Sequence, residues 1–114
     1  MGTRENKEII RKLYEDGFRN DPDRLEQFFT PGYVDHTLVK NLAGLKTNLK
    51  AFHTAFPNAS WKIEDMIAEG EKVAVRSEMK IATGMGSART LRSTVFYRLE
   101  NGRIAETWGT SDPL

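Results

Sequence analysis

The sequence contains no cysteine, which excludes disulfide bridges, thiolate nucleophiles and thiolate metal sites. It also lacks long hydrophobic runs, since no stretch approaches the roughly 18 consecutive apolar residues of a membrane-spanning helix. The first residues are polar and lack the apolar segment of a secretory signal peptide. From these absences we expect a cytoplasmic protein.

The sequence also lacks an excess of charge of either sign. The 17 Lys and Arg residues nearly balance the 16 Asp and Glu residues, for a formal net charge of +1. The basic residues are interleaved with acidic ones, as in the stretch RENKEIIRKLYED. Nucleic acids and anionic membranes are bound through a basic excess gathered on one face. We therefore expect neither kind of partner.

Histidine is rare as well. The two histidines, His36 and His53, stand 17 positions apart and belong to no His-x-His pair or carboxylate triad. That pattern does not make a metal site. We expect a protein that works without a metal or a cofactor.

The remaining composition is that of a small globular domain. Hydrophobic residues make up 39% and charged residues 29% of the chain, both ordinary fractions. A chain of 114 residues is long enough for one domain and not comfortably for two. No repeat, low-complexity tract or linker interrupts it. We expect a single domain over residues 1–114.

The first half of the chain has the apolar spacing of helices. Residues 6–21 and 20–29 each place their large apolar residues on one helical face, and Pro22 suits the first turn of the second segment. Residues 41–58 repeat the pattern and end at Pro57. We expect three helices. Their apolar positions are Ile9, Ile10, Leu13, Tyr14, Phe18, Leu25, Phe28, Phe29, Leu42, Leu45, Leu49, Phe52 and Phe56.

From Trp61 onward the apolar period changes to two, which is typical of strands. We expect four strands, at residues 61–70, 72–83, 88–102 and 103–112. The Asn-Gly pair at positions 101 and 102 predicts a tight hairpin between the last two. The first strand is expected to turn Trp61, Ile63 and Asp65 to one face, and the second Val73, Val75, Ser77, Met79 and Ile81.

Helices followed by a run of strands indicate an α+β domain, in which the helices cover one face of an antiparallel sheet. Between the two parts lies the stretch GYVDHTLV, residues 32–39, an apolar ribbon that carries Tyr33, Asp35 and His36. We expect it to be extended. Neighbouring side chains of an extended chain point to opposite sides, so we expect only one of Asp35 and His36 to face the interior.

Several segments, in this order and spacing, resemble the SnoaL-like branch of the NTF2-like superfamily. They are YVDH (33–36), GLKTNLKAFHTAFPN (44–58), IEDMIAEGEKVAVR (63–76) and VFYRLENGRIAETWGTSD (95–112). The resemblance implies a cone-shaped fold, shared with ketosteroid isomerase and limonene epoxide hydrolase. In that fold three N-terminal helices pack on a curved, mainly antiparallel sheet around an internal cavity. It further implies a small hydrophobic molecule bound in the cone and a homodimer formed through the sheet.

The resemblance points to two candidate catalytic residues, His36 and Asp112. SnoaL-like cyclases carry an acid/base carboxyl a few residues after a Glu-x-Trp motif, and here Asp112 follows Glu106-Thr107-Trp108. His36 falls on the position of the general base of ketosteroid isomerase, and histidine exchanges protons near neutral pH. The alternative interpretations are a solvated C-terminal Asp112 and a His36 that faces water.

Two related activities match less well. The steroid isomerase uses a Tyr on the first helix and a protonated Asp on the third strand of the sheet, yet Tyr14 is about one residue out of register and Val95 stands near the Asp position. Epoxide hydrolysis uses an Asp-Arg-Asp set, which Arg76, Glu78 and Asp112 match imperfectly. Arg76 and Glu78 are better explained as a cross-strand ion pair on the solvent or dimer face.

The same resemblance suggests a pocket lined by aromatic and polar side chains. Residues 82–93 are shorter than the family segment and lack its His and Glu, so we expect a changed pocket entrance. His53 is also compatible with simple packing on its helix. The predicted substrate-binding residues are Tyr33, His53, Arg76, Trp61, Tyr97 and Trp108.

We therefore expect a protein that binds a small hydrophobic molecule in its cone. If it is an enzyme, the expected chemistry is cofactor-free proton transfer, as in a polyketide cyclase or an isomerase. The alternatives are a ligand-binding or dimerisation module without turnover, and an enzyme of the epoxide hydrolase type.

Overall fold

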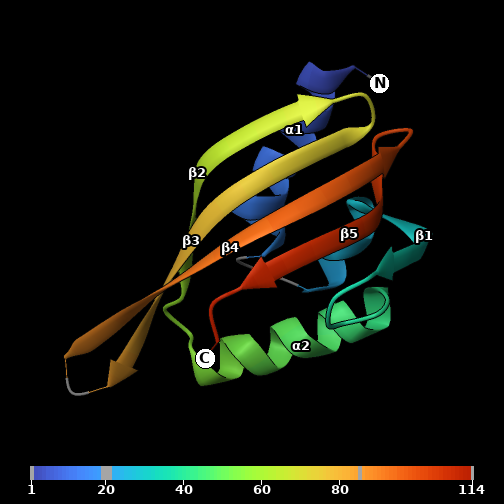
Figure 1. Ribbon diagram of the computed structural model, residues 1–114. Helices are drawn as coiled ribbons and strands as arrows, with labels where there is room; N and C mark the ends of the chain where they lie inside the picture. The colour runs from blue at the N-terminus through green and yellow to red at the C-terminus, as the bar shows by residue number, and fades with distance from the viewer. Residues whose placement is uncertain (1, 19–21, 85, 114) are drawn as a thin grey trace.

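One five-stranded sheet organises the molecule, as the computed structural model in Figure 1 shows. The structure describes residues 2–18, 22–84 and 86–113. The four expected strands are present and pair antiparallel with one another, and a fifth strand precedes them, so that the order is β1-β5-β4-β3-β2. The strands are β1 (Phe29–Asp35), β2 (Ser60–Glu69), β3 (Lys72–Gly84), β4 (Ser87–Glu100) and β5 (Arg103–Ser111).

Strand β1 runs parallel to β5, which the sequence did not indicate. Phe29 pairs with Ile104, and after a shift in register Asp35 pairs with Thr107. Phe29, expected at the end of a helix, is instead the first residue of the strand and is buried. The expected extended ribbon at residues 32–39 is therefore present as far as Asp35, and the following residues form a loop.

The described residues form two α-helices instead of the expected three. They are α1 (Thr3–Lys12), which continues as a π-helical turn at Leu13–Gly17, and α2 (Leu42–Ala55). In Figure 1, α1 lies behind the sheet and α2 crosses below its lower end. Within the described ranges, neither helix is long and apolar enough to cross a membrane.

The middle segment is only a short 3₁₀ helix, Pro22–Gln27. The Phe28 amide donates to the Leu25 carbonyl at 2.9 Å, three residues back, which is the tight spacing of a 3₁₀ turn. Residues 20 and 21 of the helix predicted over 20–29 lie outside the described residues, and over the rest the prediction was wrong because the apolar residues serve two elements. Leu25 packs in the core from the 3₁₀ helix, whereas Phe29 does so from a strand.

A β-bulge in β2 changes which residues face the core. Ile63 pairs with Ser77 and Asp65 with Arg76, so that one extra residue is inserted on β2. Trp61 and Ile63 pack against the core as expected, but beyond the bulge Met66 and Ala68 do so. Asp65, expected on the inner face, is exposed.

The other strand predictions are confirmed. Val73, Val75, Ser77 and Ile81 are buried along β3, whereas Arg76 is exposed. The β4–β5 turn places Asn101 at φ 49° and Gly102 at φ 81°, the left-handed conformations that an Asn-Gly hairpin turn requires. Strands β3 and β4 stay paired out to Gly84 and Ser87 and project as a long hairpin (Figure 1). Met85 at its tip lies outside the described residues.

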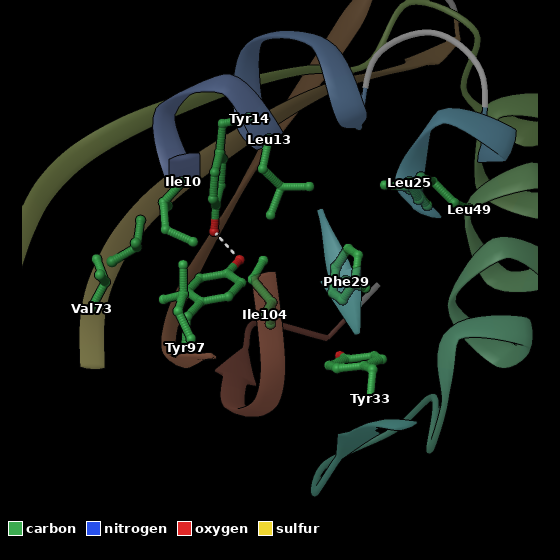
Figure 2. Close-up of a cluster of buried hydrophobic side chains, with 12 residues drawn as sticks. Ile10, Leu13, Tyr14, Leu25, Phe29, Tyr33, Leu49, Val73, Tyr97 and Ile104 are labelled. Atoms are coloured by element: carbon green, nitrogen blue, oxygen red, sulfur yellow. Dashed lines mark hydrogen bonds between the residues drawn. The ribbon is translucent and has the colours of Figure 1, made fainter. Parts of the chain in front are cut away.

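The core between sheet and helices contains three buried tyrosines (Figure 2). The hydroxyls of Tyr14 and Tyr97 are hydrogen-bonded to each other at 2.7 Å, and the Tyr33 hydroxyl is 2.6 Å from Oγ1 of Thr107. Buried hydroxyls without partners would destabilise the fold, so these pairs allow polar groups inside an apolar core. The fully buried aliphatic residues around them are Ile10, Leu13, Leu25, Val73, Val75 and Ile104.

The start of α2 lies unusually close to the preceding loop. Asn41 caps the helix, since its Oδ1 accepts from the Gly44 amide at 2.8 Å. A Cβ atom on Gly44 would lie 2.0 Å from the carbonyl oxygen of Val39. Glycine is therefore required here by the contact with the loop, although it weakens an isolated helix.

We predict that Gly44→Ala lowers the free energy of unfolding by about 2 kcal/mol, because the loop must move away from the helix. In an exposed helix the same change raises stability by about 1 kcal/mol. Urea unfolding should be compared with that of Lys50→Ala, an exposed position in the same helix. A Gly44→Ala variant at least as stable as the wild type would contradict the close contact.

Because the three tyrosines are buried, we predict that the protein loses stability at high pH. Burial raises the pKa of Tyr33 to about 12, and burial also raises the pKa of Tyr14 and of Tyr97. An unfolded tyrosine ionises near about pH 10. The contribution of the buried tyrosines to the free energy of unfolding is therefore fully present below about pH 10. It falls as the pH rises towards 12, because the unfolded chain releases protons that the folded chain keeps.

Tyrosinate absorbance of the folded protein should accordingly stay near zero at about pH 10.5, whereas the urea-unfolded chain is largely ionised. The variant Tyr33→Phe should show a shallower fall in the free energy of unfolding over the same pH range. Ordinary ionisation of all three tyrosines in the folded protein would contradict the buried core.

Candidate functional site

Two neighbouring cavities lie between the inner face of the sheet and helix α2. Their volumes are about 320 Å³ and about 230 Å³. Ligand pockets usually measure about 300 to 1,000 Å³, so the larger cavity by itself has room for a small ligand. The residues that line both are Phe18, Leu38, Ser93, Val95, Tyr97 and Ser111.

The larger cavity is mostly apolar, with a few polar groups. Tyr14 and Tyr97, whose hydroxyls are hydrogen-bonded to each other, line it, and Ser77 and Ser93 face each other across β3 and β4 with their Oγ atoms 2.9 Å apart. Apolar walls with a few convergent polar groups are typical of small-molecule sites. The wall residues are Phe18, Leu49, Phe52, Trp61, Met79, Leu91 and Val95.

Asp112 also lines the larger cavity, directly after the end of β5. Its amide donates to the Arg92 carbonyl at 2.9 Å, and its Oδ2 accepts from the Arg92 amide, also at 2.9 Å. These two hydrogen bonds hold an exposed carboxylate against β4. Asp112 is therefore a fixed residue at the cavity rim, not a loose end of the chain.

The smaller cavity contains a chain of polar side chains formed by Tyr33, Thr107 and Asp35. The Tyr33 hydroxyl contacts Oγ1 of Thr107 at 2.6 Å, and Thr107 donates to Oδ1 of Asp35 at 2.8 Å. Oδ2 of Asp35 accepts from the amides of Leu38 and Val39 at 2.7 and 2.9 Å. The sequence did not predict Thr107 as a site residue.

The carboxyl group of Asp35 is stabilised in its charged form. Burial raises its pKa, but hydrogen bonds from the Leu38 amide, from Thr107 and from the Val39 amide outweigh burial. The net pKa lies below the usual value of an aspartate. Asp35 is therefore ionised at neutral pH and accepts hydrogen bonds without donating any.

The expectation that His36 faces the cavity is wrong, because its ring lies on the outer face of the sheet. It stacks on Trp108 with the ring centroids 5.0 Å apart and the planes 11° from parallel. Its Nε2 is 2.7 Å from Oε2 of Glu106, and the other carboxylate oxygen of Glu106, Oε1, accepts from Nε of Arg98 at 2.6 Å. The side chain is 41% exposed. Asp35 is the member of the pair that faces the interior.

The strand period contained the signal that was missed. Tyr33 was expected in the pocket, and a residue two positions later on an extended chain shares its side, whereas a residue three positions later does not. Tyr33 and His36 therefore could not both line one pocket. A catalytic role for His36 stays a prediction, but the cavity geometry does not support it.

The remaining predicted site residues divide between the two faces. Tyr33, Tyr97 and Trp61 line the cavities. His53 packs edge-on against Trp61, and its Nε2 is 2.5 Å from the carbonyl oxygen of Phe18, so it supports the wall from behind. Arg76 lies with Trp108 on the outer face.

Arg76 does not join Asp112 in a common site. Its guanidinium donates to Oδ2 of Asp65 at 2.8 Å, and its side chain is 61% exposed. Glu78 contacts Arg92 at 3.4 Å. The set of Arg76, Glu78 and Asp112 considered for epoxide hydrolysis is thus not assembled. Among the residues that the structure describes, no group of His, Asp or Glu side chains is arranged to hold a metal ion.

The family model of the SnoaL-like polyketide cyclases matches residues 8–114. A search of the curated proteins finds no match. Among solved structures, IdmH from Streptomyces antibioticus, a candidate polyketide cyclase, superposes with a TM-score of 0.83 at 22% identity, over 94% of this chain and 91% of its own.

Two further structures are similar. A SnoaL-like polyketide cyclase from Agrobacterium tumefaciens has a TM-score of 0.75 at 19% identity, with 98% of this chain and 93% of its own covered. AclR from Streptomyces galilaeus, a candidate hydroxylase, has a TM-score of 0.86 at 17% identity, with 97% and 77% covered. At such identities the structures show a shared fold alone, and the family model, which spans nearly the whole sequence, decides the family. The chain belongs to the SnoaL-like polyketide cyclase family.

Proposed function

We propose that the protein binds a small hydrophobic molecule in its two neighbouring cavities and catalyses cofactor-free proton transfer on it, such as a cyclisation or an isomerisation. The observation that supports this most is the position of Asp112. Asp112 is held by two hydrogen bonds with Arg92, one donated by its backbone amide and one accepted by its carboxylate, at the rim of a cavity of about 320 Å³ whose walls are largely apolar. A carboxylate beside an apolar pocket is a suitable general base for an acidic C–H bond.

The Tyr14–Tyr97 pair supplies the second group that such a reaction needs. Removing a proton next to a carbonyl group places negative charge on the carbonyl oxygen, and a nearby hydroxyl stabilises that charge by donating a hydrogen bond. Burial raises the pKa of both tyrosines. Their hydroxyls therefore keep both protons at neutral pH, and the hydrogen bond between them uses one of the two.

We predict that Asp112→Asn lowers turnover by about 100-fold or more, while ligand affinity and thermal stability change little. Asparagine keeps an oxygen for the Arg92 amide, so the residue stays in place. Turnover is measured by mass spectrometry on a ketone identified from a panel of aromatic and polyketide-like compounds. The matched control, Asp16→Asn on the exposed side of the π turn, should keep wild-type activity. Full turnover by Asp112→Asn would refute the assignment.

A ligand-binding module without turnover is the second candidate. It is favoured by the other carboxylate of the cavities, Asp35, because the hydrogen bonds to its oxygens hold it in a structural position. Deuterium exchange separates the two functions. An enzyme of the proposed kind exchanges the acidic C–H protons of a bound ketone with D₂O, whereas a binding module leaves them in place, as NMR of the ketone detects.

The outer face of the sheet suggests a partner. Ile67, Ala74, Phe96 and Trp108 are consecutive cross-strand neighbours on β2, β3, β4 and β5. Ile67 is 69% and Phe96 48% exposed, and contiguous exposed apolar side chains mark interaction surfaces. We propose that a second copy of the chain packs on this row and forms a homodimer through the sheet.

We predict that Phe96→Glu converts the dimer to a monomer, because it places a charge in the apolar row. Phe96 is exposed in a single chain, so the variant should fold. Light scattering after gel filtration measures the mass, with Thr47→Glu on the exposed side of α2 as the charge-matched control. A wild-type protein that is monomeric at micromolar concentration would contradict the proposed dimer.

A further inference from the structure

The hydrogen-bond directions in the smaller cavity are fixed by its charged end. An ionised carboxylate only accepts hydrogen bonds, and the geometry has Thr107 donating its single hydroxyl proton to Oδ1 of Asp35 at 2.8 Å. Thr107 then has no proton left for Tyr33. The 2.6 Å contact between the two hydroxyls must therefore be donated by Tyr33 and accepted by Thr107.

This direction determines what Tyr33 offers to a ligand. A phenol has one proton and accepts through its oxygen, and the proton of Tyr33 is used within the chain. Tyr33 and Thr107 both line the cavity of about 230 Å³. To a ligand that reaches it from that cavity, the Tyr33 oxygen is consequently an acceptor, and a ligand carbonyl or ether placed there would face lone pairs.

We propose that the smaller cavity is a subsite selective for a ligand group that donates a hydrogen bond to Tyr33, such as a phenol, an enol or an alcohol, and that discriminates against carbonyl and ether groups. The inference rests on the proposed function in one respect, namely that the cavities bind a small hydrophobic molecule. It adds a chemical class to that molecule, which carries a hydroxyl group next to an apolar body.

The larger cavity has the opposite preference. The Tyr14 and Tyr97 hydroxyls hold two protons, and the hydrogen bond between them at 2.7 Å uses one. Tyr14 is also hydrogen-bonded to Ser77, which is a neutral hydroxyl partner, whereas the proton of Tyr33 is committed through Thr107 to the charged Asp35. The two cavities share Tyr97 and Val95 in their walls. A ligand that spans both is therefore oriented with its hydroxyl towards Tyr33 and its carbonyl towards Tyr14 and Tyr97.

A pair of probes that differ only in the donor tests the subsite. We measure the binding of 2-naphthol and of 2-methoxynaphthalene by isothermal titration calorimetry at pH 7. The ratio that is compared between variants is the dissociation constant of 2-methoxynaphthalene divided by that of 2-naphthol. Tyr33→Phe removes the acceptor and keeps the ring, which packs edge-on against Phe29 at 4.5 Å. The wild type should prefer 2-naphthol, and Tyr33→Phe should reduce that preference about 3- to 10-fold, the effect of one hydrogen bond.

Two variants of Thr107 provide the controls. Thr107→Ser keeps the hydroxyl and should keep the wild-type ratio. Thr107→Val removes the acceptor for the Tyr33 proton, so that Tyr33 becomes able to donate. This variant should bind 2-methoxynaphthalene about threefold more tightly relative to 2-naphthol than the wild type does. Circular dichroism and the melting temperature verify that each variant is folded.

The outcomes separate the inference from the proposed function. Equal ratios in the wild type, Tyr33→Phe and Thr107→Val would overturn the donor-selective subsite, while binding of both probes still agrees with a ligand cavity. If neither probe binds the wild type up to its solubility limit, the ligand-binding function itself fails and the subsite fails with it. A ratio that falls in Tyr33→Phe and in Thr107→Val but not in Thr107→Ser supports the inference.

Discussion

The parallel pairing of β1 with β5 is the constraint on which the cavities depend. It places Asp35 opposite Thr107 and so assembles the chain Tyr33–Thr107–Asp35 from two segments far apart in the sequence. Asp35 then holds the amides of Leu38 and Val39, which fixes the loop against the start of α2. The contact between Gly44 and the Val39 carbonyl completes this corner. One strand pairing thus positions both the loop that lines the smaller cavity and the start of the helix next to it.

The two faces of the sheet divide the chemistry of the molecule. The inner face carries neutral hydroxyls, apolar walls and two carboxylates, Asp35 and Asp112. The outer face carries the ion pairs of Arg76 and Arg98 and an apolar row centred on Phe96. This division explains why residue types that look catalytic, such as His36, need not be. The strand period, and not the residue type, decides which side chain reaches a ligand.

Much of the fold could be predicted from the sequence, because periodicity reports burial directly. The β3 alternation and the Asn101–Gly102 turn followed from local patterns alone. The failures are all places where tertiary contacts override a local pattern. The β2 bulge moved Asp65 outward, and the pairing of Phe29 with Ile104 drew an apparent helix end into a strand. A parallel pairing between the first and last strands leaves no local signature, so the position of β1 in the sheet, next to β5, could not be predicted.

The site was predictable to a smaller extent. Tyr33, Trp61, Tyr97 and Asp112 line the cavities, and their roles in binding and catalysis stay predictions. Thr107 was missed, because an isolated threonine in a strand has no chemical signature until the acceptor beside it is known. Its role arises only from the 2.8 Å contact with Asp35.

The central claim is that small hydrophobic molecules bind between the inner face of the sheet and α2. Intermolecular nuclear Overhauser effects from bound 2-naphthol to assigned methyl groups test it most directly. The account predicts contacts with the methyls of Leu49 and Val95, which line the cavities. Contacts with Ile67 and Ala74 on the outer face, in place of these, would contradict it.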